Sequence, residues 1–272
     1  MTIHSYFKAE KGDPDWQFTP EQYFDKKFKI IDASTIELQE DIEDRIILRQ
    51  TPSDKSLLAK HLCISALPGS TLDLIVINDA DSKLQQIFLY DIHVKENANL
   101  NLHVFVKDGK LNKHIFQIIL HEGANSAVTG LMSNSVGGDT EIITKILHQG
   151  ISSTSDQLVL GLADNNSQTV FQSMTLMADK CDSSRATIEN SNLILSKGSR
   201  CYGKPEVYIG ADSVSASYGS FTEYLDEKKL EYLRSRGLSE EKSRQIIVEG
   251  FQKQVFSLME SNLVEELKQL YK

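Results

Sequence analysis

The stretch LNLHVFVK, residues 100–107, places an apolar side chain at every second position from Leu100 to Val106. Successive side chains of a β-strand point to opposite sides, so these apolar residues share one face. A single apolar face predicts a strand that is half-buried against a core. It is the clearest of many short extended segments between about Lys27 and Ser217.

Similar segments recur on both sides of this strand, separated by polar turns such as Asp108-Gly109 and Gly137-Gly138. The predicted strands are 72–77, 86–90, 114–120, 126–132, 139–147, 157–162, 169–176, 186–195 and 206–209. Asn-Gly hairpin turns are absent, and no helices able to act as βαβ crossovers separate the strands. A coil of parallel strands satisfies both facts, because each turn pairs with the next and buries a shared apolar column. There is no sequence repeat, so spacing alone leaves a β-sandwich open as the alternative.

The pattern changes to that of helices near the C-terminus. Residues 226–236 carry acids early and arginines late and end at Gly237, as the helix dipole and C-cap preferences predict. Ser239 is the expected N-cap of a second helix, and a third short helix is expected from Asn262. These helices carry more apolar surface than they can bury among themselves. Packing on the strand domain and a groove for a partner are both consistent with that surplus.

Composition sets limits on the partners. The 272 residues are 40% hydrophobic and 25% charged, which is ordinary for a globular protein. The 29 basic and 38 acidic residues give a net charge of −9, so a nucleic-acid partner is not expected. No apolar run approaches the roughly 20 residues of a membrane-spanning helix. The first residues resemble neither a secretory nor a transit signal, so we expect no membrane partner and a cytoplasmic location.

Local motifs of nucleotide and hydrolase chemistry are missing. The sequence has no phosphate-binding loop, no GxGxxG and no GxSxG, so any nucleotide chemistry is expected in a partner. The seven histidines show no HExxH and no close pairing with cysteine of the zinc-site kind. Asp91 and His93 share a strand face and are a candidate hydrogen-bonded pair. Cys63, between Leu62 and Ile64, is expected to be a small buried hydrophobe.

Cys201 is the candidate reactive thiol of the three cysteines, which are too far apart for a disulfide framework. Residues 198–203, GSRCYG, are predicted to form a polar turn, where Arg200 and Lys204 would lower the pKa of this thiol. An ordinary exposed turn thiol is the alternative.

Several C-terminal blocks resemble one known family. NLILS at 192–196, KPEVYIGAD at 204–212 and LEYLRSRGLSEEKSRQIIVEGF at 230–251 are similar to the end of the SufB/SufD family, the scaffold components of the SUF iron–sulfur cluster assembly machinery. LHEGANSAVTGL at 120–131 follows the family order upstream. The resemblance covers about 120–255, half of the chain, and several ordered blocks rarely agree by chance.

The resemblance implies a right-handed parallel β-helix followed by a C-terminal α-helical domain. We divide the chain into a short N-terminal segment at 1–26, the β-helix at 27–217 and the helical domain at 218–272. Since little sequence precedes the first strands, the chain is expected to be a reduced or divergent member of the family.

The resemblance also implies partners. The β-helix would associate with a SufB-type or identical subunit, and the C-terminal helices would dock a SufC-type ATPase whose ATP binding remodels the scaffold interface. A transient iron–sulfur cluster would be assembled at that subunit interface, with none bound tightly. Non-catalytic scaffolding is therefore the expected function. The candidate ATPase contacts in the helices are Tyr232, Leu233, Arg236 and Phe251.

Within the family the chain resembles SufD more than SufB. SufD proteins carry a Ser-His-Gly stretch whose histidine contributes at the interface, whereas this chain has Ser217-Tyr218-Gly219. A phenol is a poorer iron ligand than imidazole at neutral pH, so Tyr218 is carried forward as an interface residue and not as a cluster ligand. Cys201 resembles the SufB interface cysteine, although its distance from the next proline differs by about two residues. Thiolate is a suitable iron donor, which makes Cys201 the candidate metal ligand.

Two functions of other classes remain as alternatives. One is a β-helix enzyme acting on polysaccharide, which would need clustered carboxylates that the assigned strand faces do not supply. The other is a homodimeric adaptor that holds no cluster, consistent with tyrosine at position 218.

Overall fold

The computed structural model describes residues 33–37, 43–50, 57–80, 82–259, 264–265, 267–268 and 271. The elements in chain order are β1 (Ala33–Glu37), β2 (Glu43–Gln50), β3 (Leu57–Ala66), β4 (Thr71–Ala80), β5 (Gln85–Val94), β6 (Asn99–Asp108), β7 (Leu111–Leu120), β8 (Asn125–Asn134), β9 (Asp139–His148), β10 (Thr154–Ala163), β11 (Gln168–Met177), β12 (Arg185–Ile194), β13 (Arg200–Ile209), β14 (Ser215–Tyr224), α2 (Glu227–Ser235) and α3 (Glu240–Phe256).

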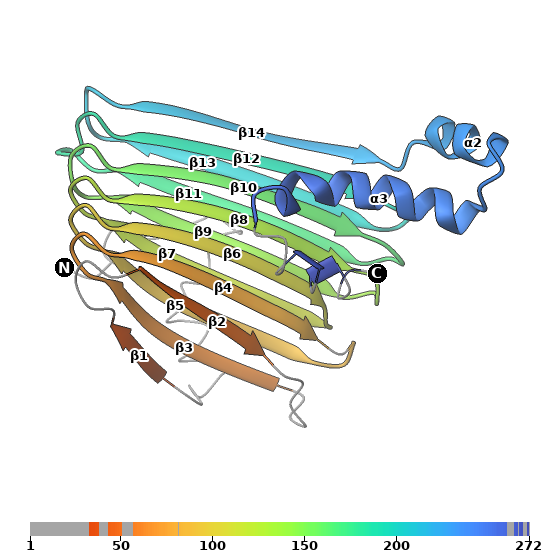
Figure 1. Cartoon of the computed structure of the whole chain (residues 1–272), viewed down its shortest axis with the longest axis horizontal. Coiled ribbons are helices and arrows are strands. Elements are labelled where there is room, and N and C mark those ends of the chain that lie inside the picture. Colours follow the sequence, from red (N-terminus) through yellow and green to blue (C-terminus); the bar gives the residue numbers. More distant parts are fainter. Residues whose placement is uncertain are drawn as a thin grey trace, which may run out of the picture.

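The strands form two seven-stranded sheets that coil around a common core (Figure 1). The odd sheet contains β1 to β13 and the even sheet contains β2 to β14, and every strand pairs in parallel with the strand two before or after it. Thr71 pairs with Asn99 and Asn99 with Asn125, so equivalent residues lie 28 and then 26 positions apart. The parallel β-helix is confirmed, and the β-sandwich alternative is wrong because neighbouring strands run parallel and not antiparallel.

The core between the sheets is built from the alternating faces predicted by the sequence. In β6 the residues Leu100, Leu102, Val104 and Val106 are all buried in one continuous cluster. Phe116 and Phe171 of later turns extend the same cluster along the stack. Each turn of the β-helix packs only against the turn before it and the turn after it. The shared apolar column therefore buries hydrophobic surface that a single turn could not bury alone.

Polar side chains also lie inside the coil, and several of them are hydrogen-bonded to one another. The ring of His148 bonds through Nδ1 to Ser153 Oγ and through Nε2 to Ser155 Oγ, both at 2.8 Å. Burial lowers the pKa of His148 to about 4 and that of His114 to about 3, so both rings are neutral at pH 7.

The helices follow the predicted caps. The Asp226 carboxylate accepts hydrogen bonds from the amides of Lys228 and Lys229 at the start of α2, and Ser239 Oγ accepts from the Lys242 amide at the start of α3. Gly237 has φ +91°, the left-handed conformation that follows a helix C-terminus. The expected caps at Ser239 and Gly237 are therefore confirmed.

The outer face of the even sheet is covered by α3 (Figure 1). Phe251, Val255 and Phe256 belong to one apolar cluster with outward residues of five strands, which are Ile75, Phe105, Leu131, Leu160 and Leu193 among others. Arg244 fixes the other end of the helix through a 3.0 Å hydrogen bond to the Leu195 carbonyl and an ion pair with Asp164 at 3.4 Å. A helix late in the sequence thus contacts turns of the coil formed much earlier.

The domain limits in the described residues differ in one respect from expectation. The boundary expected between residues 217 and 218 falls inside β14, which continues to Tyr224 before α2 begins at Glu227. Alternation alone did not reveal β14, because its sequence SASYGSFTEY is mostly polar. The segment at 1–26 and the expected helix start at Asn262 lie outside the described residues.

Candidate functional site

The last turn of the coil, β13 and β14, ends both sheets as the structure describes them. Each strand is hydrogen-bonded to a neighbour on one side only, so its other edge carries unpaired backbone groups. Large apolar and aromatic side chains are exposed on these two strands. They are Tyr202, Tyr208, Ile209, Tyr218, Phe221 and Tyr224, with exposed fractions of 49–69%. An edge that combines free backbone groups with exposed aromatics has the properties of a protein interface.

Tyr218 occupies the open end of the core. It pairs in register with Ile188, which is fully buried in the apolar column, and so continues that inward face. No further turn covers it among the described residues, and it is 63% exposed. The expected interface residue is therefore accessible to a second molecule.

Cys201 lies in β13 and not in the predicted polar turn. It is 8% exposed and packs with Ala163 and Ile194, and its sulfur accepts a hydrogen bond of 3.2 Å from Thr169 Oγ1. Burial raises the pKa of this thiol, although the Thr169 hydrogen bond acts in the opposite direction. The expectation of a thiol activated by Arg200 and Lys204 is wrong, because desolvation is the larger effect.

Cys201 and Tyr218 lie apart on the last turn. Cys201 packs with Ile194, whereas Tyr218 is paired with Ile188, six residues earlier on the same strand. At about 3.3 Å per residue this is a separation of roughly 20 Å along the sheet. The two residues cannot bind one small metal cluster from within a single chain.

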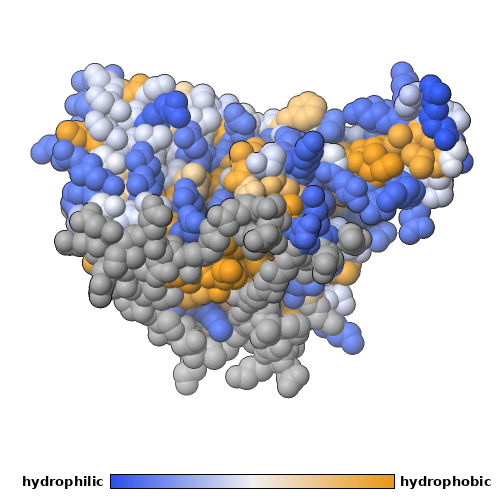
Figure 2. Space-filling model, in the orientation of Figure 1, coloured by the Kyte–Doolittle hydropathy of each residue, from blue (hydrophilic) through white to orange (hydrophobic). Residues whose placement is uncertain are grey.

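The helical hairpin of α2 and α3 presents a second exposed surface. Tyr232 is 58% exposed, and the guanidinium of Arg236 lies 5.2 Å from the centre of its ring, a cation–π contact. Leu233 is half-buried beside them. Figure 2 shows hydrophobic surface gathered on the lobe at the right, where α2 and the start of α3 project beyond the sheets.

Phe251 is placed differently from the other three candidate contacts. Its side chain is 9% exposed and belongs to the apolar cluster between α3 and the even sheet. While α3 is docked, this side chain is not accessible to a partner. Tyr232, Leu233 and Arg236 thus remain the surface candidates, and Phe251 supports them by holding the helix.

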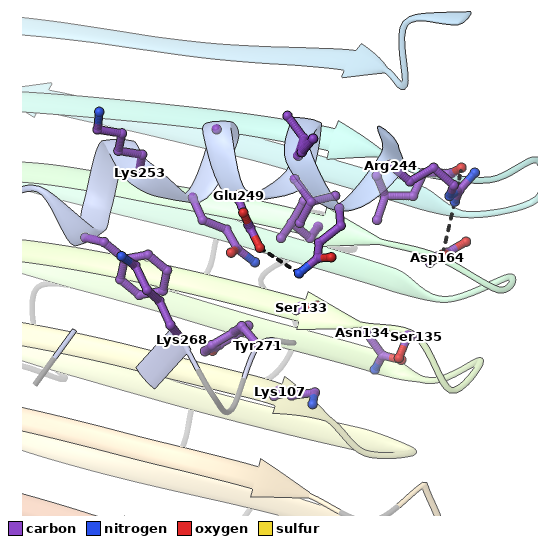
Figure 3. A pocket seen from close by; sticks show the side chains of 18 of the residues that line it. Lys107, Ser133, Asn134, Ser135, Asp164, Arg244, Glu249, Lys253, Lys268 and Tyr271 are labelled. Atoms are coloured by element: carbon purple, nitrogen blue, oxygen red, sulfur yellow. Dashed lines mark hydrogen bonds and ion pairs between the residues drawn. The ribbon is translucent and has the colours of Figure 1, made fainter. Parts of the chain in front are cut away.

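A cleft of about 760 Å³ runs between α3 and the ends of the even strands (Figure 3). Arg244 and Asp164 close it at one end, and Lys268 and Tyr271 lie toward the other. The Tyr271 hydroxyl donates a 3.0 Å hydrogen bond to the Leu131 carbonyl. The cleft is therefore bounded at one end by the Arg244 contacts of α3 and toward the other end by the contact of Tyr271, which lies after α3.

The family model described as SUF system FeS cluster assembly, SufBD core domain, matches residues 25–251. The chain belongs to the SufBD family. The match extends well upstream of the blocks at 120–255 that suggested the resemblance and includes both the parallel strands and most of α3.

Curated SufBD proteins of several bacteria are similar to the chain. It is 32% identical over 146 residues to an iron–sulfur cluster assembly SufBD family protein of Synechocystis sp., covering 52% of this chain and 32% of that protein. It is 25% identical over 202 residues to a family protein of Staphylococcus epidermidis and 24% identical to one of Staphylococcus aureus. The staphylococcal alignments cover 69% of this chain and 43% of each relative. The chain thus spans between a third and a half of the length of these relatives.

One cluster of polar residues in this SufBD chain was missed by the sequence analysis. His61, Cys63 and Asp91 come together on the outer face of the odd sheet, with His61 Nε2 2.7 Å from Asp91 Oδ2. Asp91 thus pairs with His61 and not with His93, and Cys63 points outward and is half-buried. None of the zinc-site motifs sought in the sequence includes the pair His61 and Cys63, whose side chains lie 3.8 Å apart in the structure. The signal was their spacing of two residues, but the contribution of Asp91 depends on strand register.

Among the described residues, no α-helix is both long enough and apolar enough to cross a bilayer. The cytoplasmic location expected from the sequence stays a prediction.

Proposed function

We propose that the chain is a non-catalytic, SufD-like scaffold subunit of the SUF iron–sulfur cluster assembly complex. In this proposal the β-helix pairs with a SufB-type subunit or a second copy of the chain, and the helical hairpin docks a SufC-type ATPase. ATP hydrolysis then belongs to the partner, and the nascent cluster is cargo held at the subunit interface. Family membership supports the role in cluster assembly.

The open strand edges of the last turn are the main support for the proposed pairing of two subunits through their β-helices. Strand addition at β13 and β14 would satisfy the unpaired backbone groups of both sheets at once. It would also cover exposed aromatic side chains such as Tyr218, Phe221 and Tyr224, which have exposed fractions of 61–69%. Burial of aromatic side chains at the centre of an interface contributes strongly to affinity.

The exposed hairpin supports a separate site for the ATPase. Tyr232 lies in α2 and Arg236 is the C-cap residue of the same helix, and both are exposed to solvent. Tyrosine and arginine are enriched among the residues that dominate interface energies. Because α3 is fixed across several turns of the coil, a force applied to the hairpin would reach the scaffold, as ATP-driven remodelling requires.

Two single variants test the two surfaces independently. Phe221→Glu adds a charge to the edge of β14 and is expected to abolish association with a SufB-type subunit or self-association while retaining ATPase binding. Tyr232→Glu on α2 is expected to give the opposite result. Co-purification and analytical ultracentrifugation of the full chain with each partner measure both outcomes.

Val136→Glu is the matched control, since Val136 is 42% exposed in the turn between β8 and β9 and belongs to neither β14 nor α2. It is expected to leave both interactions intact. Retention of both interactions by Phe221→Glu and Tyr232→Glu, with unchanged circular dichroism, would overturn the assignment of the surfaces. Failure of the unmodified chain to bind any of these partners would overturn the scaffold function itself.

The contribution of Cys201 to the cluster is part of the same proposal. The thiol is buried, but it lies in the last strand of its sheet, so displacement of one turn suffices to expose it. Anaerobic reconstitution with both partners is expected to give less iron and sulfide with Cys201→Ser than with the unmodified chain. Cys181→Ser, another buried thiol, is the control. Equal cluster content in all three proteins would exclude Cys201 as a ligand.

The homodimeric adaptor is the second candidate, and tyrosine in place of the family histidine favours it. The reconstitution experiment distinguishes the adaptor from the cluster scaffold. An adaptor would still self-associate through β14, but its reconstitution would yield no cluster. For the polysaccharide enzyme, the described residues offer no support, because their only close group of three metal-binding side chains contains a single carboxylate.

A further inference from the structure

The outer face of the odd sheet carries three different donor atoms in one place. His61 and Cys63 stand two residues apart on β3 and so share a face, and Asp91 of β5 is the register partner of Cys63. The imidazole, thiol and carboxylate ligand atoms all lie within 4.8 Å of one another. Two strands of adjacent turns therefore bring the set together, and both are held by ten-residue parallel pairing.

A hydrogen-bonded histidine–aspartate pair explains only part of this arrangement. It accounts for the 2.7 Å contact between His61 Nε2 and Asp91 Oδ2. It does not explain why Cys63 Sγ lies 3.8 Å from the same His61 nitrogen. It also leaves Asp91 Oδ1 buried with no hydrogen-bond partner in the described structure. A buried oxygen without a partner calls for a further ligand.

We propose that His61, Cys63 and Asp91 form a site for a zinc-class divalent metal ion. Zinc binds histidine nitrogen, cysteine sulfur and carboxylate oxygen at bond lengths that put tetrahedral donors roughly 3.3–3.6 Å apart. The sulfur–nitrogen distance of 3.8 Å is close to that range, and the nitrogen–oxygen distance needs to open by about 0.6 Å. Three protein donors leave the fourth position of the ion for water or another ligand.

The donor set also decides the class of metal. Calcium and magnesium prefer oxygen ligands only, so a thiolate and an imidazole select against them. The side chains of His61 and Asp91 are 22% and 19% exposed, which leaves a route for the ion from solvent. The site belongs to β3 and β5, early in the coil, whereas the proposed partner surfaces are on β13, β14 and α2. It is independent of the scaffold proposal.

Metal binding by the purified full chain tests the proposal. With Zn²⁺ in competition against a chromophoric chelator, we expect a single tight site that weakens by more than about 100-fold in Cys63→Ser and in His61→Gln. Cys181→Ser and His103→Gln are the matched controls and are expected to bind as the unmodified chain does. Circular dichroism establishes that each variant is folded.

Co²⁺ supplies a second measurement that depends on the identity of the ligands. The unmodified chain is expected to show a thiolate-to-cobalt charge-transfer band in the near ultraviolet, and Cys63→Ser is expected to lack it. Tight binding that survives Cys63→Ser, or the absence of tight binding in the folded unmodified chain, would overturn the proposal. Since no partner is involved, that result would leave the scaffold function standing.

Discussion

At the scale of single residues, the interior polar groups are the least expected feature of the coil. His148 is fully buried, and its two ring nitrogens bond to Ser153 and Ser155. Both serines come from the turn and strand that follow β9, so the ring joins the two sheets. A neutral imidazole fits here because buried polar groups must find partners, whereas a buried charge would remain without compensation.

The buried histidine makes folding sensitive to acid. Burial lowers the pKa of His148 from 6.5 to about 4, so below pH 6.5 the unfolded chain gains a proton that the folded chain cannot accept. The free energy of unfolding therefore decreases as the pH falls from about 6.5 to about 4. The contribution of His148 to this decrease is up to about 3 kcal/mol.

His148→Gln tests this dependence, because glutamine does not titrate. The variant is expected to be less stable at neutral pH but to show a smaller loss between pH 6.5 and 4 than the unmodified chain. Thermal denaturation followed by circular dichroism across this range provides the measurement. Parallel curves for the two proteins would contradict the assigned role of His148.

At the scale of elements, the close stacking of turns leaves no room for some side chains. Gly138 stands just before β9, and a Cβ placed there would lie 2.0 Å from the Gly109 carbonyl oxygen and 2.8 Å from Lys110 Cα. Both contacts are with backbone of the preceding turn of the coil, which cannot move aside without disturbing its own pairing. The glycine is needed for close approach and not for an unusual φ.

Gly138→Ala is therefore expected to destabilise the fold by about 1–3 kcal/mol. Gly250→Ala is the matched control: Gly250 is exposed within α3 and has nothing within 4 Å of an added Cβ. Alanine there is expected to stabilise the protein by about 0.5–1 kcal/mol, because it is the better helix former. Urea denaturation of both variants measures the difference. Equal effects would show that the turns are not in close contact at Gly138.

Strand positions were largely predictable from the sequence, but their neighbours were not. The stretch at 100–107 lies within β6, and the segment at 114–120 lies within β7, because alternation reports which face is buried. Pairing depends on the spacing between turns, which varies from 26 residues for Asn99 and Asn125 to 32 residues for Gln168 and Arg200 and follows no sequence repeat. For the same reason the contact between Cys63 and Asp91, 28 residues apart, could not be predicted.

The candidate site residues also differ in how well the sequence predicted them. Tyr218 and Tyr232 were found through family blocks, and both are exposed. Cys201 was assigned to a turn because its neighbours Ser199, Arg200 and Tyr202 are polar, yet the strand begins at Arg200 and buries the thiol. Phe251 lies in a stretch similar to the family, but resemblance does not tell which side of a helix packs inward.

At the scale of the whole molecule, α3 determines how the coil behaves as a unit. Turns of a coil contact only their neighbours, so stability is nearly a sum of local terms. The apolar cluster that includes Val255 also contains outward residues of β4 to β12 and residues after the helix such as Leu267. Val255 is fully buried, so its replacement by a charged residue would release the helix from the sheet.

Val255→Asp is expected to lower the free energy of unfolding by at least about 2 kcal/mol and to increase hydrogen exchange in α3 and in the strands beneath it. Lys253→Asp, an exposed position on the same helix, is the control and is expected to leave exchange in those strands unchanged. Exchange that increases in α3 alone would show that the helix does not support the strands.

The placement of α3 also has a mechanical consequence. The helix follows β14 and α2 in the sequence, yet it packs on strands that come much earlier in the chain. A force applied to α2 is therefore distributed over several strands at once, whereas a force on a free chain end would separate one strand at a time. A protein bound to the hairpin would move the β-helix as a rigid unit without unfolding it.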